Sequence, residues 1–166
     1  MPQNDQALLI RLKSSGLDFV VIGGVCAVHH GVPMATFDLD ICCPFGEENI
    51  RRIESVVADL HPSHRLTANK LPLEMTRDRF GDLKNPNLQT DLGKLDCLSD
   101  VAGIGGFAAV DRQSIVAKFS FGEFKFLSLN ALILAKEAAG REQDLAMLRF
   151  LRPIRERLEQ QKNRRP

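Results

Sequence analysis

The most constraining stretch of the chain runs from Val20 to Cys42 and reads VVIGGVCAVHHGVPMATFDLDIC. Its apolar start predicts a buried strand, Gly23 and Gly24 open a short helix, and a loop leads to a second strand with Asp38 and Asp40. Side chains two residues apart in a strand project from one face, so these two carboxylates point together. Like charges held side by side repel unless a cation or proton lies between them. A divalent metal is therefore the expected partner.

The double glycine predicts a second kind of contact. Gly23 and Gly24 lie where a strand gives way to a helix, so their backbone N–H groups can face an anion without an obstructing side chain. We expect that anion to be a phosphate. The expected bounds are Asp18–Ile22 for the first strand and Thr36–Cys43 for the second.

A third acid lies further along the chain. Two short strands are predicted at Asn87–Asp91 and Lys94–Leu98, and Asp96 emerges between apolar neighbours in the second of them. A strand paired beside the first two acids would bring Asp96 to the same metal. Asp91 is the rival candidate, but it adjoins the turn, where aspartate is common for local reasons.

In combination these motifs resemble the signature of the nucleotidyltransferase superfamily: an apolar residue, Gly-Gly, thirteen residues, then Asp-Leu-Asp-Ile. The segment GGVCAVHHGVPMATFDLDI is similar to the small bacterial members, including those of toxin–antitoxin systems. The later segment SLNALILAKEAAGREQDLAML resembles the same families, whose late helices carry a lysine and then Arg-x-x-Asp around a glycine break. The combination is specific where a lone GG or DxD is not.

The resemblance implies an α+β fold, in which a mixed β-sheet is flanked by helices and followed by a short C-terminal helical segment. A chain of 166 residues is expected to form a single domain. Within it we expect the catalytic sheet core at residues 17–127 and the C-terminal helices with a basic tail at residues 128–166.

The activity that the resemblance implies is transfer of a nucleoside monophosphate from an NTP, such as ATP, to a hydroxyl group of an acceptor, with Mg²⁺ or Mn²⁺ as cofactor. RNA or tRNA, a protein and a small molecule stay open as the acceptor. Each matched residue takes a role from the family pattern. The expected catalytic and metal-binding residues are Asp38, Asp40 and Asp96, and the expected nucleotide-binding residues are Gly23, Gly24, Thr36, Lys136, Arg141 and Asp144.

One position departs from the family pattern, because many relatives carry an arginine where this chain has Met34. Two alternatives therefore stand beside the enzyme: a non-catalytic nucleotide- or partner-binding domain with the same fold, and a toxin–antitoxin component acting on tRNA or a partner protein. Three converging carboxylates argue against the non-catalytic alternative, since they are costly to maintain without a metal. On spacing alone, Arg141 and Asp144 could equally form an ion pair at a helix end.

Composition limits the kinds of partner and the cellular compartment that we expect for this chain. The formal net charge is +1, so a nucleic-acid or membrane partner would need a local charged patch. The four cysteines lack metal-ligand spacing and are expected as small buried residues. No membrane segment is expected, because the longest apolar run is short and broken by glycines, and the chain is predicted to be cytoplasmic. We expect the glycine-rich GIGG at residues 103–106 to be a flexible turn, and residues 61–86 to be a long connection.

Overall fold

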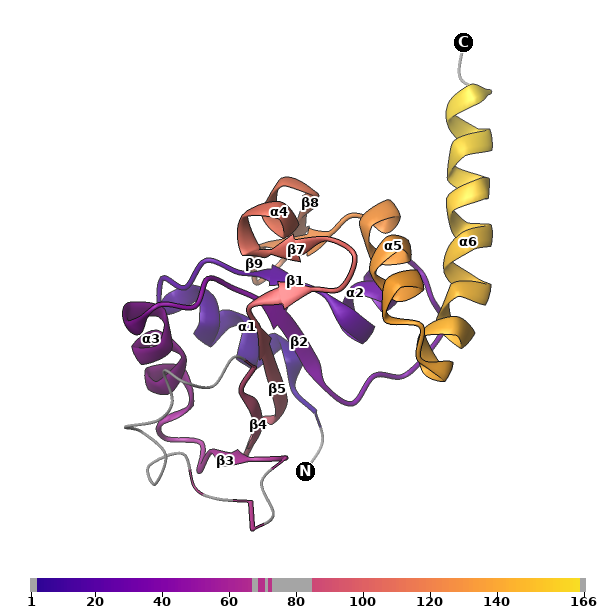
Figure 1. Cartoon of the computed structure of the whole chain (residues 1–166). Helices are drawn as coiled ribbons and strands as arrows, with labels where there is room; N and C mark the ends of the chain where they lie inside the picture. Colours follow the sequence, from indigo (N-terminus) through magenta and orange to yellow (C-terminus); the bar gives the residue numbers. More distant parts are fainter. Residues whose placement is uncertain (1–2, 67–68, 71, 73–84, 165–166) are drawn as a thin grey trace.

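The computed structural model describes residues 3–66, 69–70, 72 and 85–164 (Figure 1). The helices are α1 (Asp5–Ser14), α2 (Gly23–His29), α3 (Glu47–Val57), α4 (Phe107–Arg112), α5 (Leu129–Ala139) and α6 (Glu142–Asn163). The strands are β1 (Val20–Val21), β2 (Leu39–Cys42), β3 (Ser63–His64), β4 (Asn87–Thr90), β5 (Gly93–Leu98), β6 (Asp100–Val101), β7 (Gly105–Gly106), β8 (Ser114–Phe119) and β9 (Gly122–Leu127).

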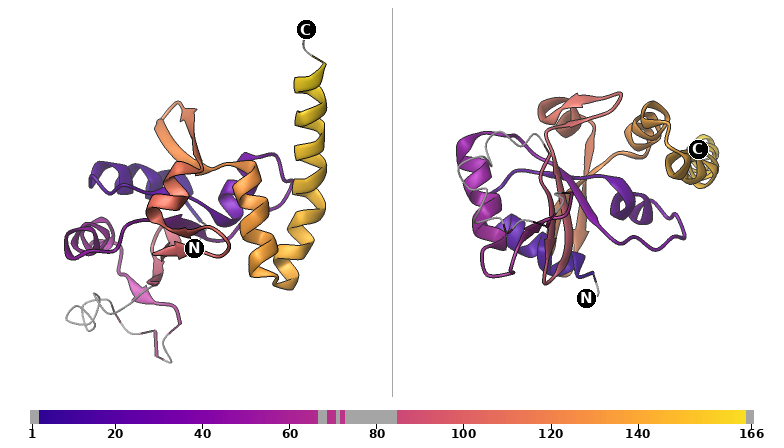
Figure 2. Two further views of the ribbon diagram at one scale, coloured as in Figure 1. Left: turned by 45° about the horizontal axis from the view of Figure 1, so that its top comes forward. Right: turned by 60° about the horizontal axis from the view of Figure 1, so that its bottom comes forward.

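Seven strands form one mixed sheet in the order β3-β4-β5-β2-β1-β9-β8. β2 runs parallel to β5 and β1 runs parallel to β9, whereas the other neighbouring strands are antiparallel. The right-hand view of Figure 2 shows α1 and α3 on one side of the sheet, with α2, α5 and α6 on the other. The predicted fold class, a mixed sheet flanked by helices with a C-terminal helical segment, is confirmed.

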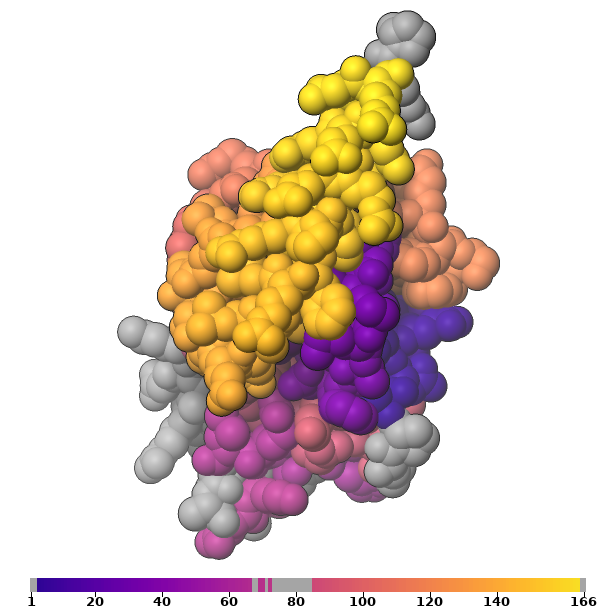
Figure 3. Space-filling view, turned by 90° about the vertical axis from the view of Figure 1, so that its right-hand side faces the viewer, coloured from indigo at the N-terminus to yellow at the C-terminus, as the bar shows by residue number. Residues whose placement is uncertain are grey.

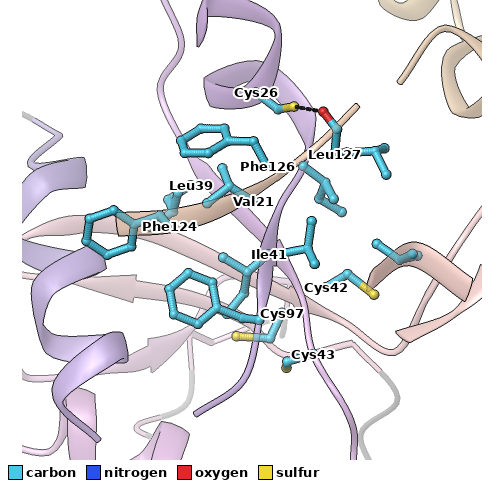
Figure 4. Packing of buried hydrophobic residues seen from close by; sticks show 14 of the residues in the cluster. Val21, Cys26, Leu39, Ile41, Cys42, Cys43, Cys97, Phe124, Phe126 and Leu127 are labelled. Atoms are coloured by element: carbon cyan, nitrogen blue, oxygen red, sulfur yellow. Dashed lines mark hydrogen bonds between the residues drawn. The ribbon is translucent and has the colours of Figure 1, made fainter. Parts of the chain in front are cut away.

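The core lies on the central strands of this sheet. Leu39 and Ile41 alternate along β2 with Asp40 between them, and both are fully buried. Figure 4 shows them packed among Phe124 and Phe126 of β9. Burial of each such side chain stabilises the fold by about 1.5 to 3 kcal/mol. Burial of these apolar residues therefore holds in place the strand that carries Asp40.

All four cysteines are free and buried, as predicted. The Cys26 thiol donates to the carbonyl oxygen of Leu127 at 3.3 Å, which is the dashed line in Figure 4. Burial raises the pKa of the Cys26 thiol to about 12 and that of Cys42 also to about 12. These side chains act as small apolar residues in the core.

The first two strands are shorter than predicted. β1 covers two residues because Ile22 already caps α2, which begins at Gly23. β2 begins at Leu39 instead of Thr36, so Asp38 precedes the strand. The Thr36 hydroxyl donates to the Asp38 carbonyl oxygen at 3.1 Å, which holds this approach to the strand in a local bend. The predicted alternation within one long strand therefore applies to Asp40 but not to Asp38.

The glycine-rich segment also differs in part from its prediction. Gly105 and Gly106 form β7, which pairs antiparallel with β6, and α4 follows directly. Gly103 and Gly105 have φ of +74° and +107°, values that glycine adopts readily. Residues 102–104 form the predicted turn, and Gly105 and Gly106 continue from it as one strand of a small ribbon. In the predicted connection at residues 61–86, Ser63–His64 forms an edge strand on β4, and residues 67–68, 71 and 73–84 lie outside the described residues.

Both ends of α5 are closed by specific caps. The Ser128 hydroxyl accepts from the N–H of Ala131, and Gly140 closes α5 in the left-handed conformation with φ of +62°. α6 packs on α5, and its C-terminal end extends beyond the rest of the molecule (Figures 1 and 3). Among the described helices, none has both the length and the apolar character that a membrane span requires.

Candidate active site

Three carboxylates meet at one edge of the central strands. β2 and β5 pair in parallel register, which places Asp40 directly beside Asp96. Asp38 approaches from the segment just before β2. One carboxylate oxygen from each of the three residues lies within 4.8 Å of the others. The structure therefore brings together the three acids that the sequence selected.

The pKa of Asp40 reports its burial and the negative charges that surround it. Burial raises the pKa of Asp40 to about 6, and the carboxylates of Asp38 and Asp96 add to the rise. Lys136 and a hydrogen bond from the backbone N–H of Gly24 act in the opposite direction. The cluster thus disfavours full ionisation in the metal-free protein, which is the situation that a bound cation relieves.

The double glycine allows the start of α2 to approach the acids. A Cβ added at Gly23 would lie 1.9 Å from Oδ2 of Asp40, and the residue has φ of +64°. A Cβ added at Gly24 would lie 2.6 Å from Oγ1 of Thr36. Both positions therefore require glycine for close contact with the site. The Gly24 N–H bonds the Asp40 carboxylate, so it orients this acid.

Asp96 has a cationic partner from another part of the chain. Nη2 of Arg65 contacts both carboxylate oxygens of Asp96. Burial raises the pKa of Asp96, and the Arg65 guanidinium opposes that rise. The side chains of Arg65 and Asp96 are 22% and 12% exposed, so the pair is largely shielded from solvent.

Two further cations are held near the acids by one buried carboxylate. Asp144 is fully buried and accepts from Nζ of Lys136 and from Nε of Arg141, each at 2.6 Å. Burial alone would raise the pKa of Asp144, but the hydrogen bonds from Arg141 and Lys136 outweigh it and lower the pKa. The alternative of a simple helix-end pair does not describe this arrangement, because Asp144 also binds Lys136 on α5. It positions both cations beside the cluster.

Two cavities flank the carboxylates. One of about 400 Å³ includes Gly24, Thr36 and Asp38 in its wall, together with Met34. The second, of about 300 Å³, is bordered by Gly23 and by apolar residues of the sheet and α5. The two cavities share five of the charged residues at the site. The shared residues are Asp40, Asp96, Lys136, Arg141 and Asp144.

The comparison with solved structures identifies this arrangement of helices and strands. A structure from Thermotoga maritima, described provisionally as a nucleotidyltransferase, matches with a TM-score of 0.51 and 16% identity, over 92% of this chain and 89% of that chain. The chain has the nucleotidyltransferase fold. Sequence comparison alone does not reach this result, since no known family and no curated protein matches the chain.

Two structures of the antibiotic-resistance factor ANT(2'')-Ia also match, each at 15% identity. The one in complex with adenylyl-2''-tobramycin has a TM-score of 0.48, over 88% of this chain and 93% of that chain. The solution structure has a TM-score of 0.46, over 97% of this chain and 98% of that chain.

Within this nucleotidyltransferase fold, each residue selected from the sequence lies at or beside the carboxylate cluster. The rival acid does not, because Asp91 pairs with Nδ1 of His61 at 2.7 Å. Met34 lies in the wall of the larger cavity, 41% exposed. Its uncharged side chain supplies no cation to this cavity.

Sequence reasoning missed Arg65. It follows the two-residue strand β3 in a region of mixed charge, and no motif surrounds it. Pairing of β3 with β4, and of β4 with β5, carries Arg65 to Asp96. To predict this contact, one would need to know the order of the strands at the sheet edge. The local sequence does not encode that order.

Proposed function

We propose that this protein is a metal-dependent nucleotidyltransferase that moves a nucleoside monophosphate from an NTP to a hydroxyl group of an acceptor, with release of pyrophosphate. The observation that carries the proposal is the convergence of Asp38, Asp40 and Asp96 within 4.8 Å, beside two cavities that both include Asp40 and Asp96 in their walls. Transfer between two bound molecules needs two adjoining spaces with the reacting groups between them. The site has this layout.

The donor set fits a hard divalent cation such as Mg²⁺ or Mn²⁺. Carboxylate oxygens are the protein ligands that these ions prefer. Three carboxylates converge, and burial together with the neighbouring charges of Asp38 and Asp96 raises the pKa of Asp40. We therefore assign one cation to Asp38 and Asp40 and a second, on the acceptor side, to Asp96. When bound, these cations would supply Lewis-acid polarisation of the phosphoryl group.

The other residues would bind and orient the nucleotide. Lys136 and Arg141 line both cavities with positive charge, and Asp144 fixes their positions. Charge-assisted hydrogen bonds from such cations bind phosphate oxygens strongly. Thr36 adds a hydroxyl in the larger cavity, and the absence of a side chain at Gly24 keeps this wall open. These residues would hold the triphosphate while the acceptor approaches.

A proton acceptor for the attacking hydroxyl is also present. Burial raises the pKa of Asp96, which makes this carboxylate a better base than an exposed aspartate. We assign to it removal of the acceptor's hydroxyl proton. Asp40 remains beside it to share the charge of the cation.

The test uses each of the four NTPs labelled at the α-phosphate, with Mg²⁺ or Mn²⁺, against cellular RNA and against cellular protein. Label in RNA or in protein supports transfer and identifies the acceptor class, including the classes expected of a toxin–antitoxin component. The matched control is Asp40→Asn, which should abolish labelling. Label in neither fraction, with no rise in melting temperature for any metal and NTP, would favour the non-catalytic binding domain.

A further inference from the structure

Asp96 is already paired with a cation that belongs to the chain. Arg65 reaches both oxygens of this carboxylate through a single nitrogen, Nη2. Among the described residues, neither Asp38 nor Asp40 forms an ion pair. The three acids are therefore not equivalent, because one of them carries its own counter-charge.

The Arg65 contact uses only part of the guanidinium. Its Nε is a buried nitrogen without a hydrogen-bond partner among the described residues. A guanidinium paired side-on with a carboxylate commonly uses two nitrogens in a fork. The end-on contact satisfies Asp96 but leaves Nε unsatisfied, and such a buried donor is unfavourable. The guanidinium would therefore form an additional hydrogen bond, through Nε, if it moved from Asp96 to an anion that it can bind through two nitrogens.

The position of Arg65 permits that movement. Its backbone N–H donates to the carbonyl oxygen of Asn87 at 2.8 Å, immediately after β3 at the edge of the sheet. The side chain is attached to an edge element and not to a core strand. Rotation of the guanidinium away from Asp96 would leave the pairing of β2, β4 and β5 intact.

We propose that Arg65 is the resident counter-cation of Asp96 and competes with a divalent cation for this carboxylate. The inference rests on the proposed function. A first cation binds through Asp38 and Asp40, whereas a second reaches Asp96 only when the guanidinium leaves. A phosphate group offers the guanidinium a two-oxygen partner. Nucleotide binding and completion of the metal site are then linked through one side chain.

The test is a titration of the nucleotide-free protein with Mn²⁺, in which electron paramagnetic resonance measures the free ion at neutral pH. Wild type should bind one Mn²⁺ and take up a second much more weakly. Arg65→Gln should bind the second with an affinity about tenfold or more higher, because a direct positive charge has been removed. Circular dichroism checks that the variant is folded.

Lys94→Gln is the matched control for a general change in charge. Lys94 affects Asp96 electrostatically, but it makes no ion pair with it among the described contacts. This variant should change Mn²⁺ affinity only slightly and keep the wild-type pattern. An equal increase in affinity for the second Mn²⁺ in Lys94→Gln and Arg65→Gln would overturn the proposal, since the loss of any nearby positive charge would then explain the effect.

Two further outcomes would also overturn it. The first is binding of two Mn²⁺ ions with similar affinity by wild type, a result that needs no folded variant. The second is an Arg65→Gln protein that retains the first ion and gains nothing at the second, which would leave the proposed function standing. Failure of both proteins to bind any Mn²⁺ would contradict the proposed function as well.

Discussion

Replacement of Asp40 by asparagine separates a metal-binding acid from a structural one. The change is nearly isosteric and removes one negative charge from the cluster. In the metal-free protein, Asp40 has a pKa of about 6 instead of 3.8, because it is buried beside Asp38 and Asp96. The folded chain therefore holds this proton more tightly than the unfolded chain.

The size of the effect follows from that pKa. One pKa unit corresponds to about 1.36 kcal/mol, so a rise from 3.8 to about 6 corresponds to about 3 kcal/mol. The stability due to the Asp40 proton is complete below pH 3.8 and is lost as the pH rises through about 6. Asparagine has no such loss. Metal-free Asp40→Asn should therefore be more stable than wild type at neutral pH by about 1 to 3 kcal/mol.

The assay is thermal unfolding of metal-free protein between pH 4 and pH 8, followed by the same measurement with Mg²⁺ and NTP. At neutral pH the variant should melt about 2 to 4 °C higher for each kcal/mol gained, and the difference from wild type should vanish at acid pH. Wild type should gain stability from metal and NTP, whereas the variant should gain little. Asp91→Asn is the control, because Asp91 pairs with His61 away from the cluster.

The refuting result is a specific pair of observations. If Asp40→Asn melts below wild type at neutral pH and still shows the full shift with metal and NTP, Asp40 is held for structural reasons. The metal assignment would then be wrong, and the enzyme proposal would lose its main support.

Three other perturbations follow from the site and the core. Gly23→Ala should lower stability and abolish the metal response, since the added Cβ would lie 1.9 Å from Asp40 Oδ2; urea unfolding and Mn²⁺ titration measure the two effects, and an unchanged metal response would contradict the close approach. Asp144→Ala should cost about 3 to 5 kcal/mol in urea unfolding, because it leaves the largely buried ammonium of Lys136 without its counter-charge, whereas Glu137→Gln, which breaks only the exposed pair with Arg152, should cost less than about 1 kcal/mol. The four cysteines should react with a thiol reagent only as fast as the protein unfolds, because all are buried; rapid labelling of the native chain would show that the core opens locally.

The sequence predicted the acids because spacing and hydrophobicity determine them locally. Asp40 lies between Leu39 and Ile41, and Asp96 between Leu95 and Cys97, and all four neighbours are fully buried. Alternation along a strand then leaves each acid on the opposite face. Asp38 also reaches the cluster as predicted, although it lies just before β2, where the Thr36 hydroxyl donates to its backbone carbonyl oxygen.

Contacts between distant segments could not be predicted in this way. The pairing of Arg65 with Asp96 depends on the order β3-β4-β5 at one sheet edge. The small ribbon of β6 and β7 likewise depends on pairing across a glycine turn, and isolated glycines suggest only flexibility. Asp144 illustrates an intermediate case: the sequence offered one ion-pair partner or the other, and the structure shows both.

The parallel pairing of β2 with β5 has a consequence for how the protein can change. Asp40 and Asp96 are neighbours in register although the intervening chain leaves the sheet centre and returns to it. Backbone hydrogen bonds, and not the length of that excursion, set their separation. Closing a longer loop is inexpensive, since each doubling of its length costs only about 0.6 kcal/mol. The parts of this excursion outside β3 and β4 could thus be lengthened while the distance between the two carboxylates stays the same.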